Sequence, residues 1–292
     1  MADPMVQRRL VGKGLRTART EADISQSEAA KELEWSASKL TRIEKGDTAP
    51  SKNDLEAALR LYEVWGTPIG EELVERGIEA RKKPWWQEFL DPTAGTREGR
   101  WGKLLSFESE AVAIDGYEPS IIPGLLQTEA YGREVLRHLA VKPGQVENLA
   151  RLRSRRREEV YGEGRRHPRV RFVLDEAVVL RRIGAPRDPS IMVAQLRYLK
   201  DQVTRHHIDL RVIPFDRGMH AGLSGPISIY EFETSGLDAV AFVKEAVFVQ
   251  DGGANEYLET FQALHDLALS PEKTMRLIDS VIDAMSTEVE AH

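Results

Sequence analysis

The sequence predicts an α plus α/β protein: an N-terminal five-helix bundle followed by a mixed α/β domain. The 292 residues exceed the usual length of one domain, which favours two. Over residues 1–80, apolar positions recur at helical spacing, and Ser residues stand where helices begin. Beyond residue 103, segments with strand-like alternation stand between helical ones. We therefore expect a helical domain over 1–80, a Trp-rich linker over 81–102 and a mixed α/β domain over 103–292.

Serine caps place the helices of the first domain. Ser25 and Glu28 have the spacing of a capping box, and Ser36 and Ser51 each precede another apolar-periodic run. Gly46 suits the left-handed position that ends a helix. The expected helices are Val6–Glu21, Ser25–Leu33, Ser36–Glu44, one from Ser51 through Tyr62, and about Pro68–Lys82. Their expected inner positions include Leu10, Val11, Gly14, Leu15, Ala18, Leu55, Ala58, Leu59 and Tyr62.

The segment 81–102 contains Trp85, Trp86 and Trp101, and we expect it to pack between the domains; the alternative is a protein or ligand surface. The second domain is expected to alternate helices and strands. The expected helices are Leu104–Ile114, Thr128–Leu139, Gln145–Tyr161, Asp175–Ile183, Pro189–His206, Asn255–Leu269 and Pro271–Met285. The expected strands are Arg169–Leu174, Ile208–Phe215, Pro226–Phe232 and Ala239–Val249, with Tyr117–Leu126 extended or in turns.

Composition excludes several classes of protein. There is no cysteine, which excludes disulfides and cysteine-ligated metals. No run reaches the ~18 apolar residues of a membrane span, and we expect a cytoplasmic protein with no membrane contact. The net charge of -6 excludes a wholly basic nucleic-acid coat, but it allows a small DNA-reading face on an acidic body.

Two short capped helices with a tight connection, over Ile24–Pro50, are typical of a helix-turn-helix, which sets its second helix in the DNA major groove. The helix Ala37–Glu44 would turn its polar side outward and bury Leu40 and Ile43. Arg42 can donate two parallel hydrogen bonds to a guanine. The candidate DNA-binding residues are Gln26, Ser27, Ser36, Ala37, Ser38, Lys39, Thr41, Arg42, Lys45 and Lys52. Such helices also occur in bundles that do not bind DNA, and the caps alone leave this alternative open.

A set of fixed spacings within this segment adds a resemblance. The matching residues are Ile24-Ser25-Gln26, Ala29-Ala30, Ser36, Ser38, Thr41-Arg42-Ile43-Glu44, Gly46 and Pro50-Ser51. This pattern resembles the XRE family, the Cro and phage-repressor-like helix-turn-helix proteins, over about Val6–Val64. The resemblance implies a five-helix DNA-binding domain in which Arg19 pairs with Glu44 in a structural role. Two residues depart from the family pattern: Glu34 replaces the usual glycine of the turn, and Trp35 is bulkier than the usual aliphatic residue. We expect the fold to tolerate both residues, with a turn that is tighter or shifted.

The charge of this domain is balanced. Residues 1–66 hold eleven Lys and Arg against eleven Asp and Glu. A weak electrostatic attraction to phosphates predicts modest affinity for one module, which favours two modules on one operator and therefore a homodimer.

The second domain carries a resemblance of its own. The matching residues are Trp85-Trp86, Phe107-Glu108, Glu110-Ala111, Tyr117-Glu118, Ile121 to Thr128, Tyr131, Arg211 to Phe215, Gly218, His220 and Gly225-Pro226. They resemble the C-terminal domain of actinobacterial WhiJ-like regulators, over most of Trp85–Met285. The resemblance implies an antitoxin-like regulator tuned by a signal or by a small partner protein encoded nearby, and it identifies no catalytic residue.

Residues suited to acid–base chemistry are present but form no recognised motif. They are Asp175, Glu176, His206, His207, His220 and Glu231. We expect Asp175-Glu176 to cap a helix and His206-His207 to end one, and we interpret His220 as an ordinary loop or cap histidine. An arginine-rich segment could grip flanking DNA or an acidic partner, or be a solvated helix face with Glu158 and Glu159 as counter-charges. Its members are Arg151, Arg153, Arg155, Arg156, Arg157, Arg165, Arg166 and Arg169.

These observations predict a sequence-specific transcriptional regulator. It would bind double-stranded operator DNA as a homodimer, and its C-terminal domain would sense a partner protein or a small ligand. We predict that it is not an enzyme and has no catalytic residue, metal site or cofactor. The alternatives are an antitoxin-like partner-binding protein with secondary DNA binding, and an enzyme that carries an XRE domain for targeting.

Overall fold

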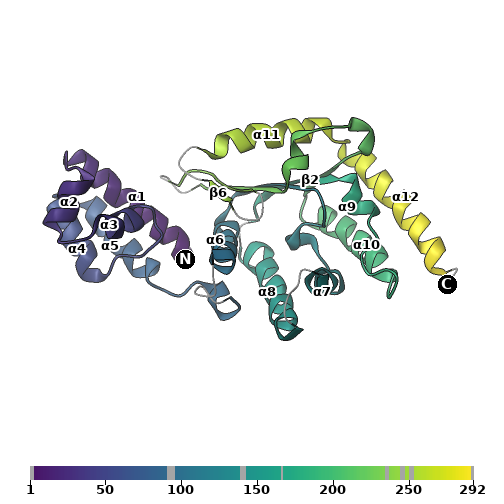
Figure 1. The fold of residues 1–292 in the computed structure, drawn as a ribbon, viewed down its shortest axis with the longest axis horizontal. Helices are drawn as coiled ribbons and strands as arrows, with labels where there is room; N and C mark the ends of the chain where they lie inside the picture. Colours follow the sequence, from purple (N-terminus) through teal and green to yellow (C-terminus); the bar gives the residue numbers. More distant parts are fainter. Residues whose placement is uncertain are drawn as a thin grey trace. The chain divides into compact units, whose positions relative to one another are not determined.

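The computed structural model describes residues 3–90, 96–138, 143–165, 167–233, 237–243, 247–249 and 253–290. The chain divides into two compact units, one formed mainly by residues 1–110 and the other mainly by residues 111–232 and 238–292. The first unit is helical, and the second combines a six-stranded sheet with helices (Figure 1). This arrangement confirms the predicted fold class.

The first unit is built around one apolar core. Its helices are α1 (Pro4–Glu21), α2 (Gln26–Glu32), α3 (Ala37–Glu44), α4 (Lys52–Leu61), α5 (Pro68–Ala80), the 3-10 helix η1 (Trp85–Glu88) and α6 (Thr96–Glu110). The expected inner residues of the first and fourth helices are buried, apart from Gly14, which is half-buried, and all the buried ones except Leu10 belong to this core. Burial of these stripes removes apolar surface from water, at about 25 cal/mol per Å², and this holds the short helices together.

Trp86 shows how part of the Trp-rich segment packs within the first unit. Its indole Nε1 donates a hydrogen bond of 2.7 Å to Ser106 Oγ on α6, and the side chain is buried. A Cβ on Gly102 would lie 2.5 Å from the Trp86 ring, so the glycine permits this close approach. Residues 91–95 of the predicted linker, with Pro92, lie outside the described residues.

The second unit contains a mixed sheet. Its strands are β1 (Ala113–Glu118), β2 (Arg169–Asp175), β3 (Asp209–Ile213), β4 (Ile227–Glu231), β5 (Val240–Val243) and β6 (Val247–Val249). They lie in the order β3-β2-β1-β4-β5-β6. The first three are parallel to one another, and β4, β5 and β6 continue the sheet in antiparallel pairs.

Helices cover both faces of this sheet. They are α7 (Glu129–His138), α8 (Pro143–Tyr161), α9 (Glu176–Leu180), α10 (Ser190–Arg205), α11 (Ala254–Leu267) and α12 (Pro271–Glu290). In Figure 1, α11 lies over one face of the sheet, and α7, α8 and α10 lie on the other side. Phe261 and Leu264 of α11 pack on apolar residues of five strands. At the edge strand β3, Val212 N donates a hydrogen bond of 3.1 Å to Thr274 Oγ1 of α12.

The prediction for residues 104–126 was wrong at its centre. The sequence predicts a helix over Leu104–Ile114 and an extended or turn segment afterwards, but α6 ends at Glu110 and β1 is a fully paired inner strand. The sequence pattern did not indicate this strand because it contains Asp115 and Gly116, two residue types that are uncommon in β-strands. Their burial is explained by the neighbouring strand: Arg171 binds both carboxylate oxygens of Asp115, at 2.8 and 2.6 Å, and the Phe172 ring occupies the space above Gly116.

Two further points concern the predicted strand over Ala239–Val249 and the predicted end of the helix from Thr128. The single strand predicted over Ala239–Val249 is a pair of antiparallel strands, β5 and β6, whose connecting residues 244–246 lie outside the described residues. Its β-branched residues gave no turn signal, so the pattern read as continuous. Leu139, the predicted end of the helix from Thr128, also lies outside them; α7 itself begins at Glu129.

Candidate nucleic-acid interface

The capping side chains predicted for α2 and α3 are in place. Ser25 accepts a hydrogen bond from Glu28 N at 3.2 Å, and Ser25 N donates to Glu28 Oε2 at 2.9 Å, so both halves of the capping box are formed. Ser36 Oγ accepts from Lys39 N at 3.1 Å. These bonds satisfy orphan N–H groups at the two helix starts and fix where the chain enters each helix.

A buried ion pair locks α3 to α1. Arg19 Nε donates to Glu44 Oε1 at 2.6 Å, and Arg19 Nη1 donates to Ile24 O at 2.7 Å. Both side chains are buried, and the hydrogen bond to Glu44 raises the pKa of Arg19 despite the opposing effect of burial. The pairing implied by the XRE resemblance is therefore confirmed. Gln26 Nε2 also donates to Glu44, at 3.2 Å, which ties the start of α2 to the same carboxylate.

Close backbone contact fixes the same two helices. A Cβ on Gly12 of α1 would lie 2.3 Å from Ile43 O and 2.7 Å from Glu44 O of α3. Only a hydrogen at this position leaves room for the α3 backbone. Gly46 adopts a φ of 72° at the end of α3, as predicted, and a Cβ there would lie 2.6 Å from Arg9 Cα. Two glycines thus set the distance of α3 from α1.

The predicted contact residues have accessible side chains. Lys39 and Thr41 are half-buried, and the other eight are exposed. On α3 itself, Leu40 and Ile43 are buried as predicted, so the helix turns its apolar side to the core and its polar side outward. The polar side of α3 therefore lies on the surface of the unit. The candidate residues at the starts of α2 and α4 are exposed as well.

The two cations of α3 differ in what holds them. Lys39 Nζ lies 2.6 Å from Asp54 Oδ1 of α4 and 4.4 Å from the centre of the Trp35 ring. Partial burial opposes ionisation of Asp54, but hydrogen bonds from Lys39 and Ser51 outweigh it and lower the pKa of this carboxyl. The ammonium of Lys39 is thus held by the protein.

Arg42, in contrast, makes only a 3.3 Å hydrogen bond from its Nε to Ser38 O, and no carboxylate of the described residues pairs with it. Its guanidinium keeps Nη1 and Nη2 for another partner. Asp54 and Trp35 were missed as neighbours of the contact residues. The sequence assigns Asp54 to the first turn of α4, and only the packing of α4 against α3 brings it to Lys39.

The turn between α2 and α3 accommodates Glu34 in the glycine position. Glu34 has a φ of 56°, Glu34 N donates to Lys31 O, and Trp35 N donates to Ala30 O at 2.8 Å. This is a Schellman ending, in which glycine is the usual left-handed residue. The family spacing is retained because Glu34 adopts the left-handed conformation itself.

We predict that Glu34→Gly stabilises the first unit by about 0.5–1 kcal/mol, because it removes a left-handed strain of about 1–2 kcal/mol and adds less unfolded-state entropy than that. Thermal unfolding of the full chain measures the change. Glu32→Gly, at the exposed last residue of α2 two positions earlier, is the control and should destabilise by about 1 kcal/mol. Equal effects of the two substitutions would contradict the assignment of strain to Glu34.

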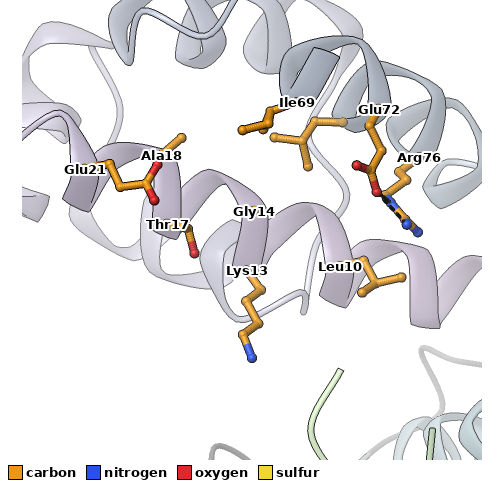
Figure 2. A pocket seen from close by; sticks show the side chains of 10 residues that line it. Leu10, Lys13, Gly14, Thr17, Ala18, Glu21, Ile69, Glu72 and Arg76 are labelled. Carbon is orange, nitrogen blue, oxygen red and sulfur yellow. Dashed lines mark hydrogen bonds and ion pairs between the residues drawn. The ribbon is translucent and has the colours of Figure 1, made fainter. Parts of the chain in front are cut away.

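A shallow cavity of about 230 Å³ lies between α1 and α5 (Figure 2). The residues that line it include the apolar Leu10, Ala18 and Leu73 and the charged Lys13 and Glu72. None of the ten candidate DNA-binding residues lines it. The cavity is therefore separate from the exposed face of α3.

Part of the arginine-rich segment of α8 has counter-charges. Arg155 pairs with Glu158 at 3.3 Å and with Glu159 at 2.5 Å, and Arg165 also pairs with Glu159. The predicted role of these two glutamates as local counter-charges is confirmed. Arg166 lies outside the described residues.

Another part of the same segment faces inward. Arg153 is buried, its Nε donates to Gln127 Oε1 at 3.1 Å, and burial lowers its pKa to about 10. Arg157 Nη1 donates to Gln127 O at 2.5 Å. The interpretation as a uniformly solvated face is therefore wrong for these two, because they hold the segment before α7 in place.

The candidate acid–base residues occupy different places. Asp175 caps α9 by accepting a hydrogen bond from Ala177 N at 2.9 Å, and His206 ends α10; both predictions are confirmed. The His206 ring stacks on Tyr161 with centroids 4.2 Å apart. His220 precedes the 3-10 helix η4 (Ala221–Ser224) as its N-cap residue, in agreement with the loop or cap position expected of it. Its side chain is only 6% exposed and lies 3.7 Å from Asp175. Among the described residues, no group of three metal-ligating side chains is found.

Comparison with known protein families finds a matching family model for each of the two parts of the chain. A family model described as a helix-turn-helix domain matches residues 11–69, which include α2 and α3. A second, described as a domain of unknown function (DUF5753), matches residues 101–280, more than half of the chain. No curated protein and no solved structure matches. In the part of the chain that the structure describes, no helix has the length and apolar character needed to cross a membrane.

The helix-turn-helix match and the accessible polar side of α3 support a DNA-binding regulator. The match to the second unit does not assign it a function. The chain belongs to the family defined by the domain of unknown function DUF5753, here preceded by a helix-turn-helix domain.

Proposed function

We propose that the protein is a sequence-specific transcriptional regulator that binds operator DNA as a homodimer, and that its second unit receives a partner protein or a small-molecule signal. One observation carries the DNA-binding part. The polar side of α3 is exposed on a helix whose position is fixed by the buried Arg19–Glu44 pair. A helix held in this way can present Arg42 to base edges at a defined angle.

The balanced charge of residues 1–66 supports two modules on one site. A single module would gain little from counterion release, so specific affinity would come from two recognition helices one helical turn of DNA apart, about 34–36 Å. We propose further that the protein acts by binding and not by catalysis, since its sequence contains no nucleophile elbow and no phosphate-binding loop.

Arg42→Ala is expected to weaken specific binding by about 1–3 kcal/mol, or roughly 5- to 150-fold, because it removes the one arginine that α3 offers to a base. Duplexes selected from a random pool by the full chain supply the operator, and gel shifts at fixed salt give affinity and stoichiometry. Arg60→Ala removes the same charge from α4, where Arg60 pairs with Glu56, and is the control. Unchanged affinity and sequence preference in Arg42→Ala, or one chain per duplex, would refute the corresponding part of the proposal.

Asp54→Asn tests how Lys39 is used. Loss of the carboxylate frees the ammonium of Lys39 for a phosphate, so binding to any duplex should strengthen. The slope of log affinity against log salt should steepen by about one unit. Glu56→Gln removes a charge from the same helix but releases Arg60, and we expect a smaller change in slope. If both variants steepen the slope equally, general charge explains the effect and Lys39 is not a masked phosphate contact.

A further inference from the structure

The carboxyl end of β1 lies at the point where the order in which the chain adds strands to the sheet reverses. The chain passes from β1 to β2 and then to β3 on one side, and then crosses to β4 on the other side of β1. In open α/β sheets, ligands bind beyond the carboxyl ends of the strands at such a switch point. Tyr117, the penultimate residue of β1, stands at this place.

Tyr117 and Asp175 share one face of the sheet. Tyr117 is paired in register with Val173 of β2, so Asp175, two residues later, points to the same side as Tyr117, the side covered by α11. Tyr117 is fully buried, and its hydroxyl has no hydrogen-bond partner among the described residues. A buried hydroxyl without a partner destabilises the folded state, so its retention requires an explanation.

His220, in the connection between β3 and β4 (residues 214–226), is the third side chain that lies beside Tyr117 and Asp175. Its ring meets Tyr117 edge to face, with centroids 5.9 Å apart, and its Nε2 lies 3.7 Å from Asp175 Oδ2, beyond hydrogen-bond distance. The side chain is 6% exposed, and Nδ1 is buried without a partner in the described part of the chain. Two nearly inaccessible side chains, those of Tyr117 and His220, therefore meet with hydrogen-bonding groups that no described residue satisfies.

The connection that carries His220 closes over Tyr117. A Cβ on Gly222 would lie 2.5 Å from the Tyr117 ring and 2.9 Å from its hydroxyl, so a glycine is needed at this contact. Gly218 and Gly225, with φ values of 68° and 131°, stand on either side of the segment. The same connection exposes Phe215, Met219 and Leu223, three large apolar side chains within nine residues.

We propose that Tyr117, Asp175 and His220 form a binding site for a small amphipathic amine, and that residues 218–225 open to admit it. The site offers a carboxylate, a ring nitrogen and a phenol oxygen, which together accept hydrogen bonds from an ammonium group. The apolar body of the ligand packs against the exposed residues of the same connection. This names the ligand class for the signal-receiving role proposed above and rests on that role.

The electrostatics of the site favour a cation. Burial raises the pKa of Tyr117, and the carboxylate of Asp175 raises it further, so the phenol stays protonated beside a negative charge. Burial also raises the pKa of Glu118 to about 7, so this carboxyl is only partly ionised near neutral pH. Glu176 Oε2 accepts a hydrogen bond from Phe215 N at 2.7 Å, which anchors one end of the connection and adds a carboxylate near it. A carboxylate-bearing ligand would be repelled by the same groups.

Three probes with one aromatic body and different head groups test the proposal: phenethylamine, phenethyl alcohol and hydrocinnamate. Calorimetric titration of the full chain without DNA gives the affinities. We expect phenethylamine to bind, the alcohol to bind about tenfold more weakly, and hydrocinnamate not to bind. Tyr117→Phe and Asp175→Asn should each lower the amine affinity by about tenfold. Asn retains a side-chain oxygen to cap α9, so the second variant should remain folded.

Tyr198→Phe on α10, which is half-buried and far from β1 in sequence, removes the same hydroxyl elsewhere and should leave binding unchanged. Circular dichroism establishes that each variant is folded. The proposal is overturned if no probe binds at millimolar concentration, if hydrocinnamate binds as tightly as the amine, or if Tyr117→Phe binds normally. Because the titration contains no DNA, its failure is distinct from a failure of Arg42→Ala to weaken operator binding.

Discussion

Glu44→Ala should destabilise the first unit by about 3–5 kcal/mol, a large part of the stability of a small domain. The substitution leaves Arg19 buried with Ile24 O as its one acceptor among the residues that the structure describes, and it also removes the partner of Gln26. An uncompensated buried charge costs far more than an exposed one because the surrounding protein solvates it poorly. Thermal and denaturant unfolding of the full chain measures the loss in the transition of the first unit.

The double variant Arg19→Met with Glu44→Leu separates the value of the pair from the cost of an unpaired charge. Replacing both charged groups by apolar ones of similar volume removes the unpaired charge, so the double variant should recover most of the loss. Glu56→Ala, which breaks the exposed pair with Arg60, should change stability by less than about 1 kcal/mol. A loss below about 1 kcal/mol in Glu44→Ala would show that the pair does not hold α3.

Gly12→Ala should cost about 3 kcal/mol and weaken DNA binding by displacing α3. The new methyl group would meet two carbonyl oxygens of the α3 backbone, at 2.3 and 2.7 Å, and neither can move unless the helix moves. The better helix propensity of Ala recovers only about 1 kcal/mol of this. Unfolding and gel-shift experiments on the same preparation measure both effects.

Gly14→Ala is the matched control on the same helix. Its methyl group would meet Leu73 Cδ2 at 2.5 Å, the flexible end of a side chain that can change rotamer. We expect a small change in stability and no change in DNA affinity. If both glycine substitutions have the same effect, the close approach of the α1 and α3 backbones does not set the position of the recognition helix.

Local signals made the first unit predictable. Ser25, Ser36 and Ser51 each cap a helix through a bond to a residue three positions later, so sequence neighbours alone place the helix starts. The apolar stripes of the helices have the same local origin. The Arg19–Glu44 pair is different, because its partners are 25 residues apart. It was predicted only through the resemblance of the whole segment to the XRE pattern.

The inner strand β1 was missed because its stability is not local. Its sequence includes Asp115 and Gly116, which disfavour strands, and it exists because Arg171 and Phe172 of β2 satisfy the charge and occupy the space. The same limit applies to Lys39, whose availability depends on Asp54 of another helix.

The sequence alone determined the caps, the helical stripes, the composition classes and the likeness of α2–α3 to a DNA-reading motif, because each depends on residues within a few positions of one another. Only the tertiary structure decided which cation of α3 is held and that β1 is an inner strand. It also brought Tyr117, Asp175 and His220 together across about a hundred residues of chain. Such contacts depend on how the sheet orders its strands, and hydrophobic periodicity carries no record of that order.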